Sequence, residues 1–200
     1  MPTKHMEALA VAKHELGHWF AARHFGFNED NIKIKVTSGM RGEIYHEAHA
    51  KSWPQPNLPD IESVYEYLLQ RIICLQAGVA AEFFDKETST FDVDSISAAY
   101  EDSASNDANQ IATYVNIARG IRFNGNVTRE NERKQYCGIA DECWFRAEKF
   151  VLDNFSLIDA MAEMMVDQLA QHDYRLNFQV HTLLEFLNSA KAQQNECAKN

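Results

Sequence analysis

Two histidines and a glutamate stand close together near the start of the chain, where residues 14–18 are His-Glu-Leu-Gly-His. On a helix, the four-residue spacing places His14 and His18 on one face, within reach of one metal ion. Zinc accepts neutral imidazole nitrogen in a tetrahedral shell, which leaves room for one more protein ligand and one water molecule. Glu15 would then take a proton from that water, whose pKa the metal lowers. The spacing therefore indicates a hydrolytic Zn²⁺ site.

The alternative is a surface helix that carries two solvated histidines, because this short pattern also arises by chance. The neighbouring residues favour the metal site. Trp19 and Phe20 follow the motif directly, and Gly17 would let another segment of the chain approach closely. A third ligand is still required, and we expect it in one of two later helices, one of which contains Glu82 while the other begins near Asp107.

Sequence periodicity places the motif on a helix that is followed by a small sheet. Residues 6–25 have apolar positions on one helical face and are followed by Gly26, so they predict a helix. Residues 32–36 alternate between apolar residues and lysine, and residues 43–49 follow a turn that contains two glycines. These two segments predict a pair of antiparallel strands directly after the metal-binding helix.

The rest of the chain predicts helices. Asp60 is suited to cap a helix that reaches about residue 84, and Ser105 is suited to cap another that reaches about residue 122. Residues 86–94 and Asn124-Gly-Asn126 predict turns, and Asn154 is expected to break a helix. The other predicted helices cover residues 95–101, 129–153, 156–171 and 178–190. We therefore expect one mainly α domain over residues 1–190, with a small inserted β-sheet, and a polar tail over residues 191–200.

Composition narrows the classes of partner and location. The net charge of −10 gives no broad positive field, so nucleic acid is not expected as a partner. No apolar run approaches the roughly 20 residues that cross a bilayer, and the N-terminus does not resemble a signal peptide. The four cysteines show no Cys-x-x-Cys spacing, which is typical of free thiols in a reducing compartment. We expect a cytoplasmic protein without membrane insertion.

Three blocks of sequence, the motif helix and two later segments, carry a family resemblance. The motif helix, the segment Leu75–Phe83 with Gly78 and Glu82, and the pair Ser89-Thr90 followed by Ala104-Ser-Asn-Asp107 occur in this order. Together they resemble the peptidase domain of the FtsH-type membrane-anchored AAA+ zinc metalloproteases, over nearly the whole chain. The resemblance implies an FtsH-peptidase-like helical zincin domain. It also implies that Asp107 is the third zinc ligand, beside His14 and His18.

The resemblance also suggests what surrounds the metal. Glu82 matches a glutamate close to the metal-binding helix, and we expect it to orient a ligating histidine rather than to bind the metal directly, which is the alternative. His46 and His49 lie on opposite faces of the predicted second strand, so they are a poor metal pair. In the family this strand borders the cleft, where a substrate could add as a further strand.

The chain also departs from the family. Ala77 and Val79 replace a glycine and an arginine, and residues 91–103 form an insertion before Asp107 that could shape or cover the cleft. No phosphate-binding Gly-rich loop with Lys and Ser/Thr is present. We therefore expect a zinc metalloendopeptidase that cleaves polypeptide without ATP, unless a separate partner ATPase assists it. The alternatives are a catalytically inactive metal-binding module that engages a protein partner, and a structural helical domain with a fortuitous motif.

Overall fold

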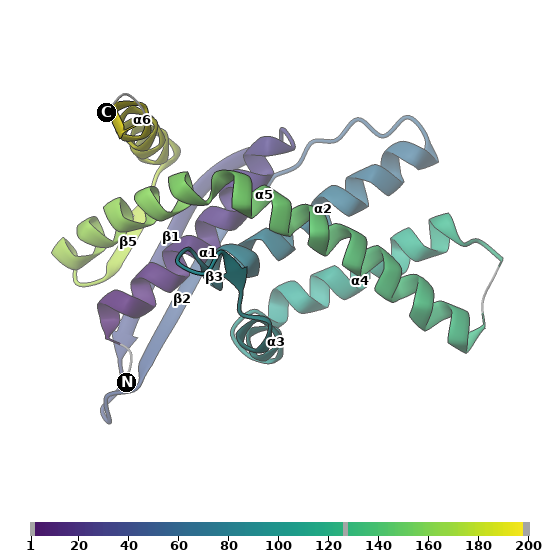
Figure 1. The fold of residues 1–200 in the computed structure, drawn as a ribbon, viewed down its shortest axis with the longest axis horizontal. Coiled ribbons are helices and arrows are strands. Elements are labelled where there is room, and N and C mark those ends of the chain that lie inside the picture. The colour runs from purple at the N-terminus through teal and green to yellow at the C-terminus, as the bar shows by residue number, and fades with distance from the viewer. Residues whose placement is uncertain (1–2, 126–127, 198–200) are drawn as a thin grey trace.

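The computed structural model describes residues 3–125 and 128–197, and it is mainly helical with a small sheet after the first helix, as predicted (Figure 1). None of the described helices combines the length and the apolar character that crossing a bilayer requires. The elements are, in order, α1 Lys4–His24, β1 Asn28–Ser38, β2 Ile44–Trp53, α2 Ile61–Glu82, β3 Phe84–Asp85, β4 Thr90–Phe91, α3 Val93–Glu101, α4 Ser105–Arg122, α5 Arg129–Gln171, β5 Arg175–Phe178 and α6 Val180–Cys197.

Helices α1 and α2 form the centre of the molecule, and α5 extends across both of them (Figure 1). Each central helix begins at a side-chain cap: Thr3 accepts a hydrogen bond from the Met6 amide, and Asp60 accepts one from the Ser63 amide. The buried residues of both helices lie on several sides of the helix in its middle, so each is enclosed rather than resting on the surface. Their burial fixes the helix that carries the His-Glu-x-x-His motif.

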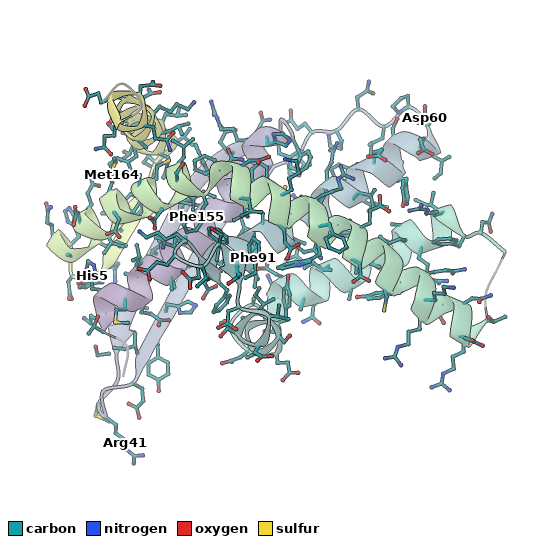
Figure 2. All side chains as sticks on the ribbon, in the orientation of Figure 1. His5, Arg41, Asp60, Phe91, Phe155 and Met164 are labelled. Carbon is teal, nitrogen blue, oxygen red and sulfur yellow. The ribbon has the colours of Figure 1, made fainter. Side chains whose placement is uncertain are left out.

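The principal sheet has the antiparallel order β2-β1-β5, so β2 is an edge strand. Ile32, Ile34 and Val36 of β1 are fully buried and face the core, which is what the alternation in sequence predicts. In the β1–β2 register, Val36 lies opposite His46 and Ile34 opposite Ala48. The connecting turn projects from the body of the molecule, with the Arg41 side chain at its tip (Figure 2).

Strand β5 was not predicted, and the long helix α5 was predicted as two. The predicted break at Asn154 is wrong, because its side-chain amide donates to the Phe150 carbonyl at 2.8 Å within one continuous 43-residue helix. The neighbouring Val151 and Phe155 are buried and continue the apolar stripe across that point. After α5 the chain turns through two residues with positive φ before β5 pairs with β1.

The other predicted element boundaries differ less from the observed ones. The helix predicted to begin after Ser105 includes Ser105 as its first residue, and Ala104 precedes it without a side-chain cap. Residues 86–94, predicted as a turn, contain the end of a β3–β4 hairpin and the start of α3. Helix α6 continues beyond residue 190 to Cys197, so most of the predicted polar tail is helical. Residues 198–200 lie outside the described residues, and so does the last residue of the turn predicted at 124–126.

Candidate metal centre

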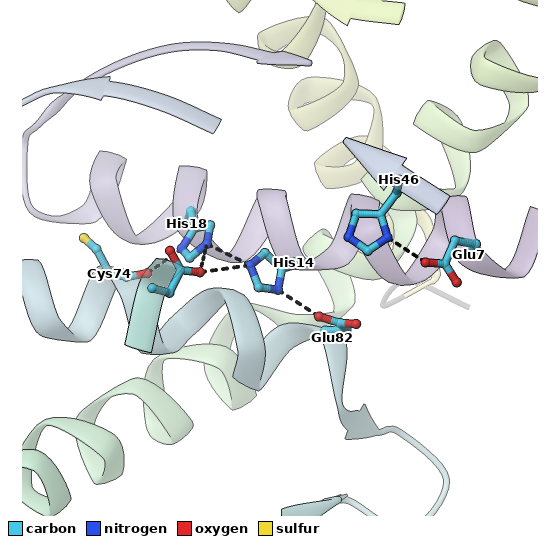
Figure 3. Close-up of polar contacts among 7 residues, drawn as sticks. Glu7, His14, His18, His46, Cys74 and Glu82 are labelled. Atoms are coloured by element: carbon cyan, nitrogen blue, oxygen red, sulfur yellow. Dashed lines mark hydrogen bonds and ion pairs between the residues drawn. The ribbon is translucent and has the colours of Figure 1, made fainter. Parts of the chain in front are cut away.

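Three potential ligand atoms from two helices converge at the middle of the molecule (Figure 3). His14 and His18 lie on one face of α1, and their Nε2 atoms are 3.0 Å apart. Asp107 comes from the first turn of α4, and its Oδ2 atom is 3.3 Å from each of the two nitrogens. The three side chains that the sequence predicts as metal ligands therefore meet at one point.

The dimensions of this triangle suit Zn²⁺. Zinc bonds to nitrogen and carboxylate oxygen of about 2.0–2.1 Å in a tetrahedral shell place neighbouring ligand atoms about 3.3 Å apart. The observed edges of 3.0–3.3 Å agree with that value. Two imidazoles and one carboxylate are also a common donor set for catalytic zinc, since they leave a fourth position open.

Hydrogen bonds that the two imidazoles donate to acceptors on α2 determine how the rings are oriented. His18 Nδ1 donates to the carbonyl oxygen of Cys74 at 2.8 Å, and His14 Nδ1 donates to Glu82 Oε2 at 2.8 Å. With hydrogen on Nδ1, each neutral ring presents a lone pair at Nε2 toward the other ligand atoms. Glu82 thus makes the contact by which a carboxylate orients a ligating histidine, and it contacts His14 rather than the centre of the triangle.

This arrangement calls for a positive charge. Two Nε2 lone pairs and the Asp107 carboxylate would otherwise face one another at hydrogen-bond distance. Burial disfavours the His14 imidazolium, but hydrogen bonds to Asp107 and Glu82 outweigh burial and raise the pKa of His14 to about 10. Burial likewise opposes the Asp107 carboxylate, yet both histidines hold the pKa of Asp107 well below its usual range. Either a proton or a metal ion between these three atoms would supply the positive charge.

Two glycines permit the close contact between α1 and α2. A Cβ atom on Gly78 would lie 2.3 Å from Cε1 and 2.5 Å from Nε2 of His18, so any side chain there would displace the imidazole. A Cβ atom on Gly17 would lie 2.3 Å from the carbonyl oxygen of Ala77. The segment that approaches Gly17 is therefore α2, and this contact brings the Cys74 carbonyl to His18.

Glu15 follows His14 directly on α1 and is only 6% exposed. Its Oε2 atom is buried and has no hydrogen-bond partner among the residues that the structure describes. Leaving a buried carboxylate oxygen without a donor is costly, so such an atom indicates a site prepared for a ligand. Glu15 lines the same cleft as His14 and His18, which suits the predicted role of proton acceptor.

His14, His18 and Asp107 line an open cleft of about 430 Å³ between α1, α2, the start of α4 and the edge strand β2. His46 is on the half-buried face of β2, where its Nδ1 atom lies 2.7 Å from Glu7 Oε1 (Figure 3). His49 is on the exposed face, so the prediction that these two histidines point to opposite faces is confirmed. Neither belongs to the metal-ligand group.

Two charged residues at or near the cleft were not singled out from the sequence: Arg71 lines it, and Glu7 contacts the cleft residue His46. Glu7 precedes His14 by seven residues, and Arg71 precedes Gly78 by seven, so each shares a helix face with residues of the site. That spacing is the signal that could have found them. Residues 91–103 also reach the cleft: Ser103 lines it, while Ile96 and Ala99 pack against Val79.

The cysteines do not form a metal site in the described structure. Cys74, Cys137 and Cys143 are free, and the side chain of Cys197 lies outside the described residues. Burial raises the pKa of the Cys74 thiol to about 12 and that of the Cys143 thiol to about 12, so both stay protonated. Cys74 contributes its backbone carbonyl to the site rather than its sulfur.

In comparison with known proteins, no protein-family model matches the chain and no curated protein matches it significantly.

Proposed function

We propose that this chain is a zinc-dependent metalloendopeptidase whose architecture is that of the FtsH-type peptidase domain. The observation that carries the proposal is the triangle of His14 Nε2, His18 Nε2 and Asp107 Oδ2, with edges of 3.0–3.3 Å, beside the buried and unpaired Oε2 atom of Glu15. A metal-ligand triangle with an adjacent carboxylate base is the arrangement that metal-assisted hydrolysis requires.

Each residue then has a defined part in peptide-bond hydrolysis. His14, His18 and Asp107 would hold zinc, which supplies a Lewis acid that lowers the pKa of water and polarises a carbonyl group. Glu15 accepts a proton on Oε2 from the attacking water and delivers it to the departing amine nitrogen. Glu82 and the Cys74 carbonyl keep the two imidazoles turned toward the centre, so that no rotation is needed during turnover.

The edge strand suggests how the substrate binds. Within the described structure, β2 pairs with β1 on one side and has no strand on the other, and residues of β2 line the cleft. An extended polypeptide can add to such an edge through main-chain hydrogen bonds, which are independent of sequence. Only an unfolded or flexible segment has those groups free, so we propose unfolded polypeptide as the substrate and no requirement for ATP.

The test is cleavage of casein, an unstructured protein, by the zinc-loaded chain with and without a chelator. We expect cleavage that the chelator abolishes and that zinc restores. The Glu15→Gln variant should keep zinc but lose at least about 100-fold in kcat, because the amide cannot accept the proton. Equal cleavage by wild type and by Glu15→Gln would show that Glu15 is not the base.

A second candidate function is a metal-binding module that engages a protein partner without hydrolysis. The position of Ser103 at the cleft favours it, because the inserted segment 91–103 brings one of its ends to the place where substrate would bind. Stoichiometric zinc together with no cleavage of casein or varied peptides would support this candidate. Any chelator-sensitive turnover would exclude it.

A further inference from the structure

The cleft contains an arginine away from the metal ligands. Arg71 lies on α2, one helical turn before Cys74, whose carbonyl group holds His18. It lines the same cleft as His18 and as the last residues of β2, from Ala50 to Trp53. His46 lines the opposite end of the cleft, where it contacts Glu7 near the start of α1. The metal ligands therefore lie between His46 and Arg71.

Arg71 has no anionic partner within residues 3–125 and 128–197. Its Nε atom is buried without a hydrogen bond, and its guanidinium makes no ion pair. Arg23, Arg119 and Arg122 differ, since each is paired with a glutamate. A guanidinium carries five N–H donors and remains charged at all physiological pH values, so leaving it without acceptors in a partly buried position is unfavourable. An unpaired arginine in a cleft therefore indicates a missing acceptor.

Aromatic rings from two separate parts of the chain flank the guanidinium. The Arg71 Cζ atom is 5.8 Å from the centre of the Phe27 ring, just before β1, and 5.8 Å from the centre of the Tyr114 ring on α4. Such contacts restrict a long side chain and do not use its N–H groups. The planar fork is thereby held in place for two parallel hydrogen bonds to one carboxylate.

None of the three carboxylates that line the cleft in the described structure pairs with Arg71. Asp107 contacts both histidines, and Glu82 contacts His14. Glu15 belongs to the same helix as the histidines, beside the metal-ligand group. Lys51, at the Arg71 end, adds a second positive charge to the lining. A bound anion at this end must therefore come from the ligand.

From these observations we propose that Arg71 binds a carboxylate group of the peptide substrate and so selects the position of cleavage. The inference rests on the proposed function in taking a peptide as the ligand. Arg71 is three residues from Cys74, a rise of about 4.5 Å along the helix. Since an extended peptide rises about 3.3 Å per residue, the bound carboxylate belongs one to three residues from the bond that is cut.

The carboxylate has two sources in a peptide, an acidic side chain or the free C-terminus. Four decapeptides of Ala, Gly, Ser and Leu, each labelled at the N-terminus with an uncharged BODIPY fluorophore, distinguish them. Two carry Glu at alternate positions and two carry Gln there, and each kind is made with a free and with an amidated C-terminus. Binding is measured by fluorescence anisotropy to the full zinc-loaded chain with Glu15→Gln, which should not consume the peptides.

The critical comparison adds Arg71→Met to that chain, with Arg122→Met as the matched control. Methionine keeps an apolar stem against the rings but removes the charge. Arg122 also contacts two aromatic rings, yet it is paired with Glu142 and lies outside the cleft. Loss of a bidentate charge-assisted contact should weaken binding of the carboxylate-bearing peptides about ten- to hundredfold. The neutral amidated peptide should bind equally to all three proteins.

The outcomes separate this inference from the proposed function. A preference for Glu peptides identifies a side chain as the ligand, and a preference for free C-termini identifies the terminus; either preference must vanish with Arg71→Met and persist with Arg122→Met. Equal binding of all four peptides, no binding of any, or equal losses with both variants would overturn the inference. Failure of the wild-type chain to cleave any of the peptides would instead count against the proposed function, because binding does not depend on turnover.

Discussion

At the scale of single residues, the direction of each hydrogen bond determines what the site can bind. A backbone carbonyl can only accept, so His18 must carry hydrogen on Nδ1 and present Nε2 to the centre. Glu82 imposes the same orientation on His14. The three converging atoms are therefore acceptors, and a cation is the partner that suits all of them.

Replacing Glu82 with alanine should weaken zinc binding without removing a ligand. Loss of the carboxylate that orients His14 is expected to lower zinc affinity about 10- to 100-fold, measured by competition with a fluorescent chelator. Glu7→Ala is the matched control, since Glu7 contacts His46, a cleft histidine outside the candidate ligand group, and should leave zinc affinity unchanged. If Glu82→Ala binds zinc as tightly as wild type, Glu82 does not position His14.

A methyl group on Gly78 should disrupt the site through steric contact alone. Its Cβ atom would overlap the His18 ring, so Gly78→Ala should cost about 1–3 kcal/mol in free energy of unfolding and weaken zinc binding strongly. Gly138→Ala is the control, because a Cβ atom there meets no atom within 4 Å and alanine favours the helix. Urea unfolding should show Gly138→Ala to be neutral or more stable. Similar losses in both variants would contradict this account.

At the scale of elements, the sequence predicts those whose pattern is local and fails where tertiary contacts decide. The motif helix, β1, β2 and α2 follow from alternation, periodicity and caps. Strand β5 is only four residues long and exists because it pairs with β1, which no local pattern reveals. The break expected at Asn154 reflects its low helix propensity, which burial of the adjacent stripe overrides. The lack of a partner for Arg71 could not be predicted for a similar reason, because it becomes visible only when α2, β2 and α4 are placed together.

One ion-pair cluster joins three elements and should make stability depend on pH. Asp159 of α5 contacts Lys13 of α1 at 2.7 Å and Lys86 of the β3–β4 hairpin at 3.0 Å. Burial would raise the pKa of Asp159, but the two lysines outweigh burial and hold it below its ordinary value. The ionised form is therefore favoured by folding. Its stabilising contribution is present above the unfolded pKa near 4 and is lost as the pH falls through the lower folded pKa.

We therefore expect Asp159→Asn to lower the free energy of unfolding by about 1–2 kcal/mol at pH 7. The difference from wild type should shrink as the pH falls below about 4. Asp153→Asn is the control, because its pair with Lys149 is exposed along one helix face and should contribute less than about 0.5 kcal/mol. Urea titrations across the pH range test this. A difference between Asp159→Asn and wild type that stays constant down to pH 2 would contradict it.

At the scale of the whole molecule, a metal ion would link α1 and α4, two helices that otherwise pack mainly on α2. Helices α1 and α4 each pack extensively on α2. The ligand set draws His14 and His18 from α1 and Asp107 from α4, so a bound ion would connect these helices directly. The start of α4 has no side-chain cap of its own, and its first turn also borders the cleft. Ligand binding and the ordering of α4 are therefore expected to be coupled.

That coupling predicts a dependence of stability on zinc that requires Asp107. Because the three ligands converge only in the folded chain, zinc at 100 times its dissociation constant should raise the free energy of unfolding by about 2.7 kcal/mol. Hydrogen exchange should slow in the first turn of α4 as well as around His14 and His18. In Asp107→Ala, the same zinc concentration should give a much smaller rise and no added protection of α4. Equal stabilisation of wild type and Asp107→Ala would show that zinc binds without α4, and the link between the helices would then not exist.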